Sequence, residues 1–259
     1  MSDQVRSSQD DWDAHWASYA DSAESNPAQR MRQDLIVQLL GETADDSEAR
    51  IFDIGSGQGD LLRQIQPLRP RAKLLGAELS ARGVAISQRK LPEATFIAAD
   101  IYQPPAILDD FAGWATHAIC SEVLEHVEDP VSFLKQARKY LTPGATLIVT
   151  VPGGPMSAFD RHIGHRQHFN RQKTRAILEQ AGYAIERVYL AGFPFFNLYR
   201  LLVIARGKRL ARDVGTQSRP ITSAAAGSMM KLFRSLFRFN LRDSRFGWQV
   251  IAVARKTSP

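Results

Sequence analysis

Apolar positions follow two periods along this chain, and the two periods alternate. Short apolar runs of strand length, bounded by turn residues, are separated by stretches in which apolar residues recur every three or four positions. Strands that alternate with helices predict an α/β fold in which helices cover both faces of a parallel sheet. The runs expected as its first five strands are 51–54, 74–79, 95–99, 118–120 and 145–151.

One connecting helix is predicted in detail. Asp129 is a capping residue, Pro130 suits the first helical turn, and apolar residues then follow the helical period as far as Leu141. The turn sequence Thr-Pro-Gly at 142–144 is expected to end this helix. The fifth strand should therefore begin directly after it, at Ala145.

Two more strands are expected after the fifth run. Asn170 is a candidate cap for a helix that ends at Gly182. The run 184–190 then follows as a strand, and the run 248–254 is expected to be the last strand. No internal repeat interrupts this order, which favours one continuous domain over residues 11–259.

The start of the chain is expected to become helical after a short disordered segment. Residues 1–10 are polar and predict disorder, whereas 11–47 predict an N-terminal helical cap. In that cap Trp12, Trp16 and Tyr19 recur at helical spacing. They are candidates for core packing or, equally, for a lid over a site.

A long segment, 193–246, separates the last two strands. It is far too long for a hairpin loop, so we expect an insertion or lid. Its first part runs from aromatic through aliphatic to basic residues, and its middle part, 215–228, is typical of a flexible linker. The last part, 231–239, predicts an amphipathic helix with Leu232, Phe233, Leu236 and Phe237 on one face and Lys231, Arg234 and Arg238 opposite.

The composition of the chain predicts neither a membrane-spanning segment nor a secretory signal. No run of eighteen apolar residues occurs, and the first residues are polar and acidic, so we expect a cytoplasmic protein. Hydrophobic residues make up 44% of the 259 positions, which is enough for a substantial core. The lone cysteine, Cys120, lies in an apolar run and is expected to be a buried thiol.

Charge is distributed unevenly along the chain. Residues 200–259 contain 13 Lys or Arg against 2 Asp or Glu, and residues 1–199 contain 20 against 25, so a +11 tail follows a −5 body. A basic tail attracts phosphate-bearing ligands, nucleic acid or an anionic membrane. A solvated basic surface without a ligand is the alternative interpretation.

The stretch 51–62, IFDIGSGQGDLL, is the first candidate for chemistry. An apolar strand there runs into a glycine loop and then into a helix. Gly55, Gly57 and Gly59 allow positive φ angles and let a ligand approach the backbone closely. The helix that follows presents free N–H groups at its start. The glycine triplet alone is a weak indication of a cofactor site.

Two carboxylates at the ends of later strands strengthen this indication. Glu78 ends the second run, where it can accept hydrogen bonds from ribose hydroxyls, and Asp100 follows the third, where it can accept from an adenine amine. The dinucleotide fingerprint G-x-G-x-x-G is replaced here by G-x-G-x-G-D. Asp60 at the helix start would repel a pyrophosphate and suit a sulfonium or an amino group.

Together these features resemble the class I S-adenosylmethionine-dependent methyltransferases over residues 48–190. The segment 120–152 is similar to the ubiquinone-type subgroup, where E-V-L-E-H-V and L-x-P-G-G recur. One departure is Ala145, which stands in place of the second glycine. The resemblance implies a Rossmann-like, seven-stranded, mostly parallel sheet with helices on both faces and an antiparallel last strand. It also implies S-adenosyl-L-methionine as the cofactor.

The resemblance further implies which residues hold this cofactor. Asp53 and the three glycines would hold the methionine part, and Glu78 the ribose. Asp100 and Ile101 would hold the adenine, and 121–122 would lie beneath the sulfonium, although Asp53 and Asp100 are also suited to capping turns. The cofactor-binding candidates are Asp53, Gly55, Ser56, Gly57, Gly59, Glu78, Leu79, Asp100, Ile101, Ser121 and Glu122.

Histidines after the fifth strand are the candidates for catalysis. An oxygen acceptor must lose its proton, and histidine is the best-matched base near neutral pH. The sequence 164–169, GHRQHF, resembles the H-x-x-H-F that precedes the penultimate helix in the ubiquinone-type subgroup, at the edge where open α/β sheets bind ligands. The catalytic candidates are His165, His168 and His126, and no metal is expected.

A metal site is the alternative for some of these residues. Glu122, Glu125 and His126 form E-x-x-E-H, which resembles a motif of some small-RNA methyltransferases and quinone-pathway enzymes, with His165 or His168 to complete the set. The acids would otherwise favour the dipole of the following helix, and His126 would pack on the fifth strand.

The leading hypothesis is O-methylation of a small or lipid-linked metabolite, such as a sugar, a quinone precursor or a secondary metabolite, with a histidine as base. An RNA methyltransferase is the alternative that the basic tail motivates, although no RNA-reading module is visible, so nucleic acid is disfavoured as a partner. A non-catalytic protein that binds S-adenosylmethionine is a further alternative. Peripheral membrane contact through 193–246 stays open, and the sequence indicates no oligomeric state.

Overall fold

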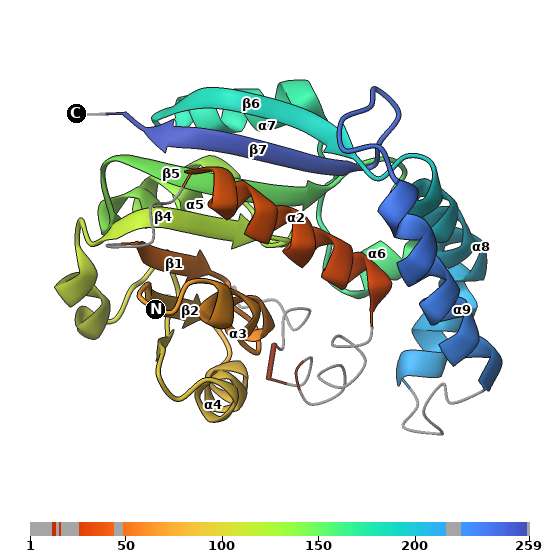
Figure 1. Cartoon of the computed structure of the whole chain (residues 1–259), viewed down its shortest axis with the longest axis horizontal. Coiled ribbons are helices and arrows are strands. Elements are labelled where there is room, and N and C mark those ends of the chain that lie inside the picture. Colours follow the sequence, from red (N-terminus) through yellow and green to blue (C-terminus); the bar gives the residue numbers. More distant parts are fainter. Residues whose placement is uncertain (1–11, 14–15, 17–25, 44–48, 216–223, 258–259) are drawn as a thin grey trace, which may run out of the picture.

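The computed structural model describes residues 12–13, 16, 26–43, 49–215 and 224–257, which fold around a seven-stranded sheet (Figure 1). The strand order is β3-β2-β1-β4-β5-β7-β6. β7 is antiparallel to both of its neighbours, and the other paired strands are parallel, which confirms the expected fold class. The predictions for residues 1–10 and for Tyr19 lie outside the described residues. The strands are β1 (Arg50–Ile54), β2 (Lys73–Glu78), β3 (Thr95–Ala98), β4 (Ala115–Ser121), β5 (Leu141–Pro152), β6 (Tyr183–Ala191) and β7 (Gln249–Lys256).

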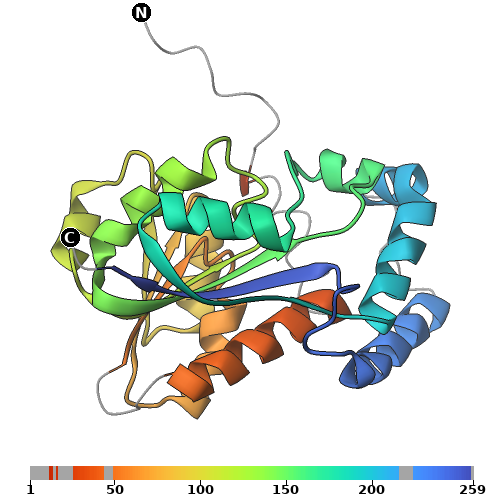
Figure 2. The same cartoon turned by 90° about the horizontal axis from the view of Figure 1, so that it is seen from above.

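Helices cover both faces of the sheet. Figure 2 shows α2 along one face, with α5 and α7 along the other. Short 3-10 turns, η1 to η4, join some of these elements. The α-helices are α2 (Pro27–Thr43), α3 (Asp60–Ile65), α4 (Ala81–Lys90), α5 (Pro130–Ala137), α6 (Ala158–His162), α7 (Arg171–Gln180), α8 (Phe195–Gly215) and α9 (Ala224–Leu236). The turns are η1 (Gln66–Leu68), η2 (Ala106–Phe111), η3 (Arg138–Tyr140) and η4 (Phe237–Phe239).

The core consists of one apolar layer on each face of the sheet. Phe52 packs into the layer that includes Leu134 of α5, whereas its neighbour Ile51 packs into the layer that includes Leu62 of α3. Successive strand residues point to opposite faces. A strand that is covered on both faces is therefore apolar at consecutive positions, which explains why the central strands appear in the sequence as unbroken apolar runs.

The helix before β5 differs from its prediction. Asp129 caps α5 as expected, accepting hydrogen bonds from the N–H groups of Val131 and Ser132, but the α-helix ends at Ala137. β5 already begins at Leu141 and includes the turn sequence 142–144. The cause is long-range pairing: Leu141 pairs with Ala115 of β4, and the hydroxyl of Thr142 donates to the Ala115 carbonyl at 3.1 Å.

The segment 193–246 is largely helical. The predicted linker is partly wrong, because its last residues, 224–228, belong to α9. The predicted amphipathic face is also partly wrong, because Leu232 is 56% exposed while Phe233 and Phe237 are buried. These two rings pack with Phe196 of α8 and with Met31 of α2, so α9 and η4 join the body of the protein through an aromatic cluster.

The strand directions decide where a site can form. The parallel strands end at one edge of the sheet, and α6, α8 and α9 stand beyond the ends of β4 and β5 (Figure 1). Open α/β sheets bind ligands at this edge. Among the described residues, no helix is long and apolar enough to cross a membrane.

Candidate functional site

The glycine loop between β1 and α3 has the backbone that only glycine adopts easily. Gly55 and Gly57 have φ angles of 77° and 56°. A Cβ atom on Gly55 would lie 2.4 Å from Cγ2 of Val123, and one on Gly57 would lie 2.7 Å from Cζ2 of Trp16. Both positions therefore exclude a side chain by conformation and by space.

Glu78 at the end of β2 holds this loop. Its carboxylate accepts the N–H of Gly57 at 2.9 Å and the N–H of Ser80 at 3.1 Å. Burial raises the pKa of Glu78, and the hydrogen bonds from Ser80, Gly57 and the Trp16 side chain oppose that rise. The expected ribose acceptor is thus a buried, oriented carboxylate directly beneath the loop.

Asp53, near the end of β1, is the second buried acid of this region. It is 3% exposed, and burial together with the nearby Glu78 raises its pKa to about 7. A cation next to Asp53 would favour the ionised carboxylate, because opposite charge lowers the pKa of an acid. The pair of carboxylates therefore suits a positively charged ligand.

Asp60, at the start of α3, forms polar contacts within the protein. Its carboxylate accepts from Nζ of Lys90 at 2.7 Å and from the side-chain amide of Gln58 at 2.7 Å. An internal lysine therefore balances its charge. The expectation that Asp60 suits a cationic ligand stays a prediction, and the buried acids Asp53 and Glu78 are further candidates for supplying that charge.

The expected adenine contacts lie at the next strand end. Oδ1 of Asp100 accepts the N–H of Tyr102 at 2.9 Å, so this carboxylate caps a turn with one of its two oxygens. Ile101 is buried, whereas Leu79, after β2, is 52% exposed. Because β1, β2 and β3 are adjacent and parallel, the structure brings these residues to the same edge as the glycine loop.

Glu122, after β4, is turned away from the histidines by a network of hydrogen bonds. Its Oε1 accepts from the hydroxyl of Thr150 at 3.1 Å and from the amide of Gln249 at 2.9 Å, and Arg32 of α2 lies 3.5 Å from its Oε2. Glu122 has a φ of 56°, which is unusual for a residue other than glycine. The network fixes it there, so Glu122 does not join the metal set that the E-x-x-E-H motif predicts.

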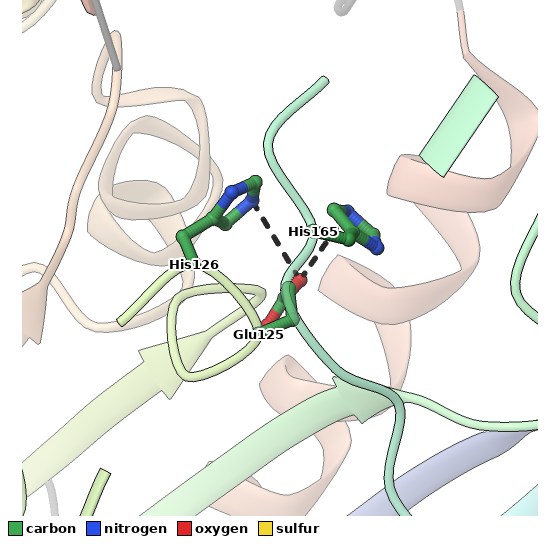
Figure 3. Close-up of side chains that lie close together, drawn as sticks. All are labelled: Glu125, His126 and His165. Atoms are coloured by element: carbon green, nitrogen blue, oxygen red, sulfur yellow. Dashed lines mark ion pairs between the residues drawn. The ribbon is translucent and has the colours of Figure 1, made fainter. Parts of the chain in front are cut away.

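Glu125 and two histidines form the centre of the second part of the site (Figure 3). Glu125 is fully buried, and neither of its carboxylate oxygens has a hydrogen-bond partner among the described residues. Nε2 of His126 lies 4.0 Å and Nε2 of His165 lies 3.9 Å from its Oε1. Burial raises the pKa of Glu125 well above its usual range.

A chain of hydrogen bonds fixes the proton of His165. Nδ1 of His168 lies 3.0 Å from the carbonyl of Gly154, which can only accept, so His168 donates there. When His168 is neutral, its Nε2 accepts, and His165 donates from Nδ1 across 3.3 Å. The lone pair of a neutral His165 therefore lies on Nε2, toward Glu125. Burial, with His126 beside it, lowers the pKa of His165 to about 3.

Asp160 anchors the loop that carries these histidines. With Ser157 it forms a capping box at the start of α6, and its fully buried carboxylate accepts two hydrogen bonds from Arg200 of α8. Burial acts to raise the pKa of Asp160, but the Arg200 guanidinium and the Ser157 hydrogen bonds outweigh it and lower the pKa to about 2. His162, next to this anchor, is exposed and lies outside the cluster.

The described part of the N-terminal cap lies on the same site. The rings of Trp12 and His126 meet edge to face with centroids 4.8 Å apart. Asp13 accepts from the hydroxyl of Ser80 and from the N–H of Arg82, beside the glycine loop. The tryptophans therefore contact candidate site residues, in line with a lid more than with core packing.

Sequence reasoning missed several side chains that hold the site together. None of these side chains belongs to a sequence motif, and each contacts a residue from a distant segment of the chain. They are Asp160, Arg200, Arg32, Thr150 and Gln249. The only sequence signal was local: Asp160 stands three residues after Ser157, the spacing of a capping box, although its acid replaces the more usual Glu or Gln. Motif reading alone could not supply their partners.

Comparison with known proteins identifies the family of this fold. Residues 26–188 match the family model described as a methyltransferase domain. A trans-aconitate 2-methyltransferase of Afipia carboxidovorans is 28% identical over 185 residues, which are 69% of this chain and 66% of that protein. A malonyl-[acyl-carrier protein] O-methyltransferase of Halalkalibacterium halodurans is 27% identical over 53% of this chain and 52% of that protein. The chain thus spans less than two thirds of the length of these relatives.

Solved structures share the fold at low sequence identity. Phosphoethanolamine N-methyltransferase 2 of Haemonchus contortus, in complex with S-adenosyl-L-methionine, has a TM-score of 0.56 and 18% identity over 88% of this chain and 53% of that chain. Geranyl diphosphate C-methyltransferase of Streptomyces coelicolor has a TM-score of 0.54 and 13% identity over 86% of this chain and 79% of that chain. Nothing in these matches singles out the ubiquinone-type subgroup.

Proposed function

Because the chain belongs to the S-adenosylmethionine-dependent methyltransferase family, we propose that it transfers a methyl group from this cofactor to an oxygen of a small or lipid-linked metabolite. His165 accepts the proton of a hydroxyl acceptor. Transfer from a sulfonium is a one-step displacement, so the protein mainly aligns the acceptor oxygen, the methyl carbon and the sulfur. The glycine loop, Asp53 and Glu78 hold the cofactor in this proposal.

The observation that carries the proposal is the placement of the His165 lone pair. Nε2 of His165 is the acceptor end of the chain from the Gly154 carbonyl through His168, at the edge of the sheet where the glycine loop also lies. The pKa of about 3 keeps this ring neutral at physiological pH, and the ring becomes a stronger base when a neighbouring negative charge stabilises its protonated form. His168 acts as a positioning residue, since both of its nitrogens are engaged.

Glu125 supports the same role. A proton on Nε2 of His165 faces the Glu125 carboxyl group at 3.9 Å, and a carboxylate stabilises an imidazolium. Burial, with the charge of Glu122 nearby, raises the pKa of Glu125, so this carboxyl group stabilises a protonated His165 only when it is itself ionised. His126 packs edge to face on the His165 ring, with centroids 4.8 Å apart, and so restricts its orientation.

Two relatives have names that support an oxygen acceptor, since trans-aconitate and malonyl groups are carboxylic acids and one name specifies O-methylation. The acceptor type changes what the histidine must do. A carboxylate is ionised at neutral pH and needs no base, whereas a hydroxyl has to lose a proton. The effect of removing His165 therefore reports the acceptor class.

A second candidate role for this cluster is binding of a divalent cation, and a specific observation favours it. The ligand atoms of Glu125, His126 and His165 lie within 4.8 Å of one another, and the Glu125 oxygens lack hydrogen-bond donors. Two imidazoles and a carboxylate are suitable ligands for zinc and related ions. Such an ion would lower the pKa of an acceptor hydroxyl bound to it.

A lipid-linked acceptor is consistent with one exposed surface. Leu198, Leu201 and Leu202 of α8 are each more than 40% exposed and recur at helical spacing, and α8 stands beyond the end of β5 (Figure 1). Apolar side chains at helical spacing beside a basic segment are typical of contact with a membrane surface. This surface supports a membrane-bound acceptor without requiring one.

The decisive experiment measures methyl transfer from labelled cofactor to panels of hydroxyl and carboxylate metabolites, including lipid-linked ones. For a hydroxyl acceptor, His165→Ala should lower kcat by about 10²-fold or more, while Arg89→Ala on α4 should leave kcat unchanged. Full activity of His165→Ala on the best hydroxyl acceptor would contradict the role of His165 as the base. Loss of activity with a chelator, restored by added metal, would favour the cation role instead.

The alternatives make different predictions in the same assay. An RNA methyltransferase would methylate RNA and lose binding steeply with salt. A non-catalytic protein would bind S-adenosylhomocysteine in calorimetry without transferring a methyl group to any fraction of a lysate. Unchanged binding of S-adenosylhomocysteine in both Gly57→Arg and Glu78→Ala would remove the cofactor assignment itself.

A further inference from the structure

A groove of about 320 Å³ lies between α2 and α9. Both cartoons show the first turns of α2 beside α9 (Figures 1 and 2). None of its described lining residues belongs to the methyl-transfer site discussed above. Four arginines line it, namely Arg30 from α2, Arg234 from α9, Arg238 from η4 and Arg242 from the segment that leads to β7.

The groove carries excess positive charge. Asp34 is the only acid among its described lining residues, and Arg30 already pairs with it at 3.3 Å. The side-chain amide of Gln64 also donates to Asp34, at 2.8 Å. Within the described parts of the chain, no carboxylate forms an ion pair with Arg234, Arg238 or Arg242. Arg234 and Arg238 therefore face the groove without an ion-pair partner among the described residues, and the charge of Arg242 also acts on Glu42, which does not line the groove.

The backbone that presents these arginines is firmly held. Phe237, which also lines the groove, is buried in the aromatic cluster. Oδ1 of Asn240 accepts the N–H groups of Phe195 and Phe196 at 2.9 and 3.1 Å. These contacts fix the end of α9 and η4 to α8, so the arginine positions are set before any ligand binds, which lowers the entropic cost of binding.

We propose that this groove binds the phosphate or diphosphate group of a small molecule or of a lipid headgroup. Guanidinium groups bind phosphate oxygens through paired, charge-assisted hydrogen bonds. The volume suits one headgroup, at the lower end of the range for ligand sites. Leu241, which lines the groove and is 52% exposed, and the neighbouring Phe239, which is 71% exposed, offer an apolar surface for whatever carries the phosphate.

This site goes beyond the proposed methyl transfer, and no step of that reaction depends on it. The test therefore measures binding by the full-length chain, in two arms. Calorimetry with inorganic pyrophosphate covers soluble phosphates. Co-sedimentation with phosphatidylcholine vesicles, with and without phosphatidic acid, covers lipid headgroups. Binding of pyrophosphate alone would assign a soluble ligand, and stronger binding to phosphatidic acid vesicles would assign a lipid.

Two double variants distinguish binding in the groove from a general attraction of anions to the positive charge of the protein. Arg234→Gln/Arg238→Gln should weaken the binding that the native chain shows by at least about tenfold. Arg71→Gln/Arg89→Gln, which removes the same charge from exposed positions elsewhere, should leave it unchanged. Retained binding of S-adenosylhomocysteine by the groove variant verifies its fold and separates this test from the methyl-transfer proposal.

Two results would overturn the proposal. The first is absence of binding in both arms. The second is an equal loss in the groove variant and in the Arg71 and Arg89 variant, which would identify a general charge effect. In the first case, binding of an RNA oligomer would identify the basic tail as a nucleic-acid surface.

Discussion

Arg200 of α8 donates two hydrogen bonds, of 2.9 and 2.8 Å, to the fully buried carboxylate of Asp160. The pair connects the segment between the last two strands with the loop that carries the histidines. Nε2 of His168 lies 3.8 Å from the same carboxylate. The position of the histidine loop therefore depends on a residue 35 positions after His165 in the chain.

Arg200→Ala should destabilise the protein strongly. Removing one partner of a buried ion pair leaves an uncompensated charge, which costs about 3–5 kcal/mol. Urea unfolding of the variant and of the native chain measures this free energy. Arg171→Ala is the matched control, because it removes an arginine from an exposed pair with Asp243 and should cost less than about 1 kcal/mol. Equal losses in the two variants would contradict the structural role of Arg200.

The same carboxylate predicts sensitivity to strong acid. The pKa of Asp160 is lowered from 3.8 to about 2 in the folded chain, so below pH 3.8 the unfolded chain binds a proton that the folded chain does not. The resulting contribution to stability, roughly 2 kcal/mol, is complete above pH 3.8 and is lost as the pH falls toward 2. Unfolding free energies of the native chain and of Asp160→Asn should converge over this window. A constant difference between them would contradict the lowered pKa.

The contrast between Asp160 and the glycine loop indicates what the sequence could predict. The central strands, the glycine loop and Glu78 follow from local patterns, because a buried parallel strand needs consecutive apolar residues and a tight loop needs glycine. The ion pair of Asp160 with Arg200 and the hydrogen bond from Gln249 to Glu122 cannot be predicted from local patterns. Each joins residues that are far apart in the chain. The error at 142–144 has the same cause, since pairing with β4 overrides a local turn signal.

Gly55→Ala should cost more stability than Gly113→Ala. Both glycines have positive φ angles, 77° and 63°, so alanine is strained at either position. A Cβ atom on Gly55 would lie 2.4 Å from Val123, whereas one on Gly113 has no atom within 4 Å. We expect about 1 kcal/mol at Gly113 from conformation alone, and at least about 1 kcal/mol more at Gly55 from the clash. Thermal unfolding compares the two, and equal losses would contradict the tight contact between the loop and Val123.

Cofactor affinity should rise as the pH increases through 7. Asp53 has a pKa of about 7 in the structure without ligand, so below that pH its buried carboxyl group is protonated and does not attract a positive charge. Above pH 7 the carboxylate is ionised and favours a cationic cofactor. The Kd of S-adenosylmethionine, measured by calorimetry, should therefore fall by several-fold between pH 6 and pH 8. Asp53→Asn should bind more weakly and with little dependence on pH in this range. A native Kd that does not change between pH 6 and pH 8 would mean that Asp53 keeps one charge state throughout, and the cationic part of the cofactor would then need a different partner.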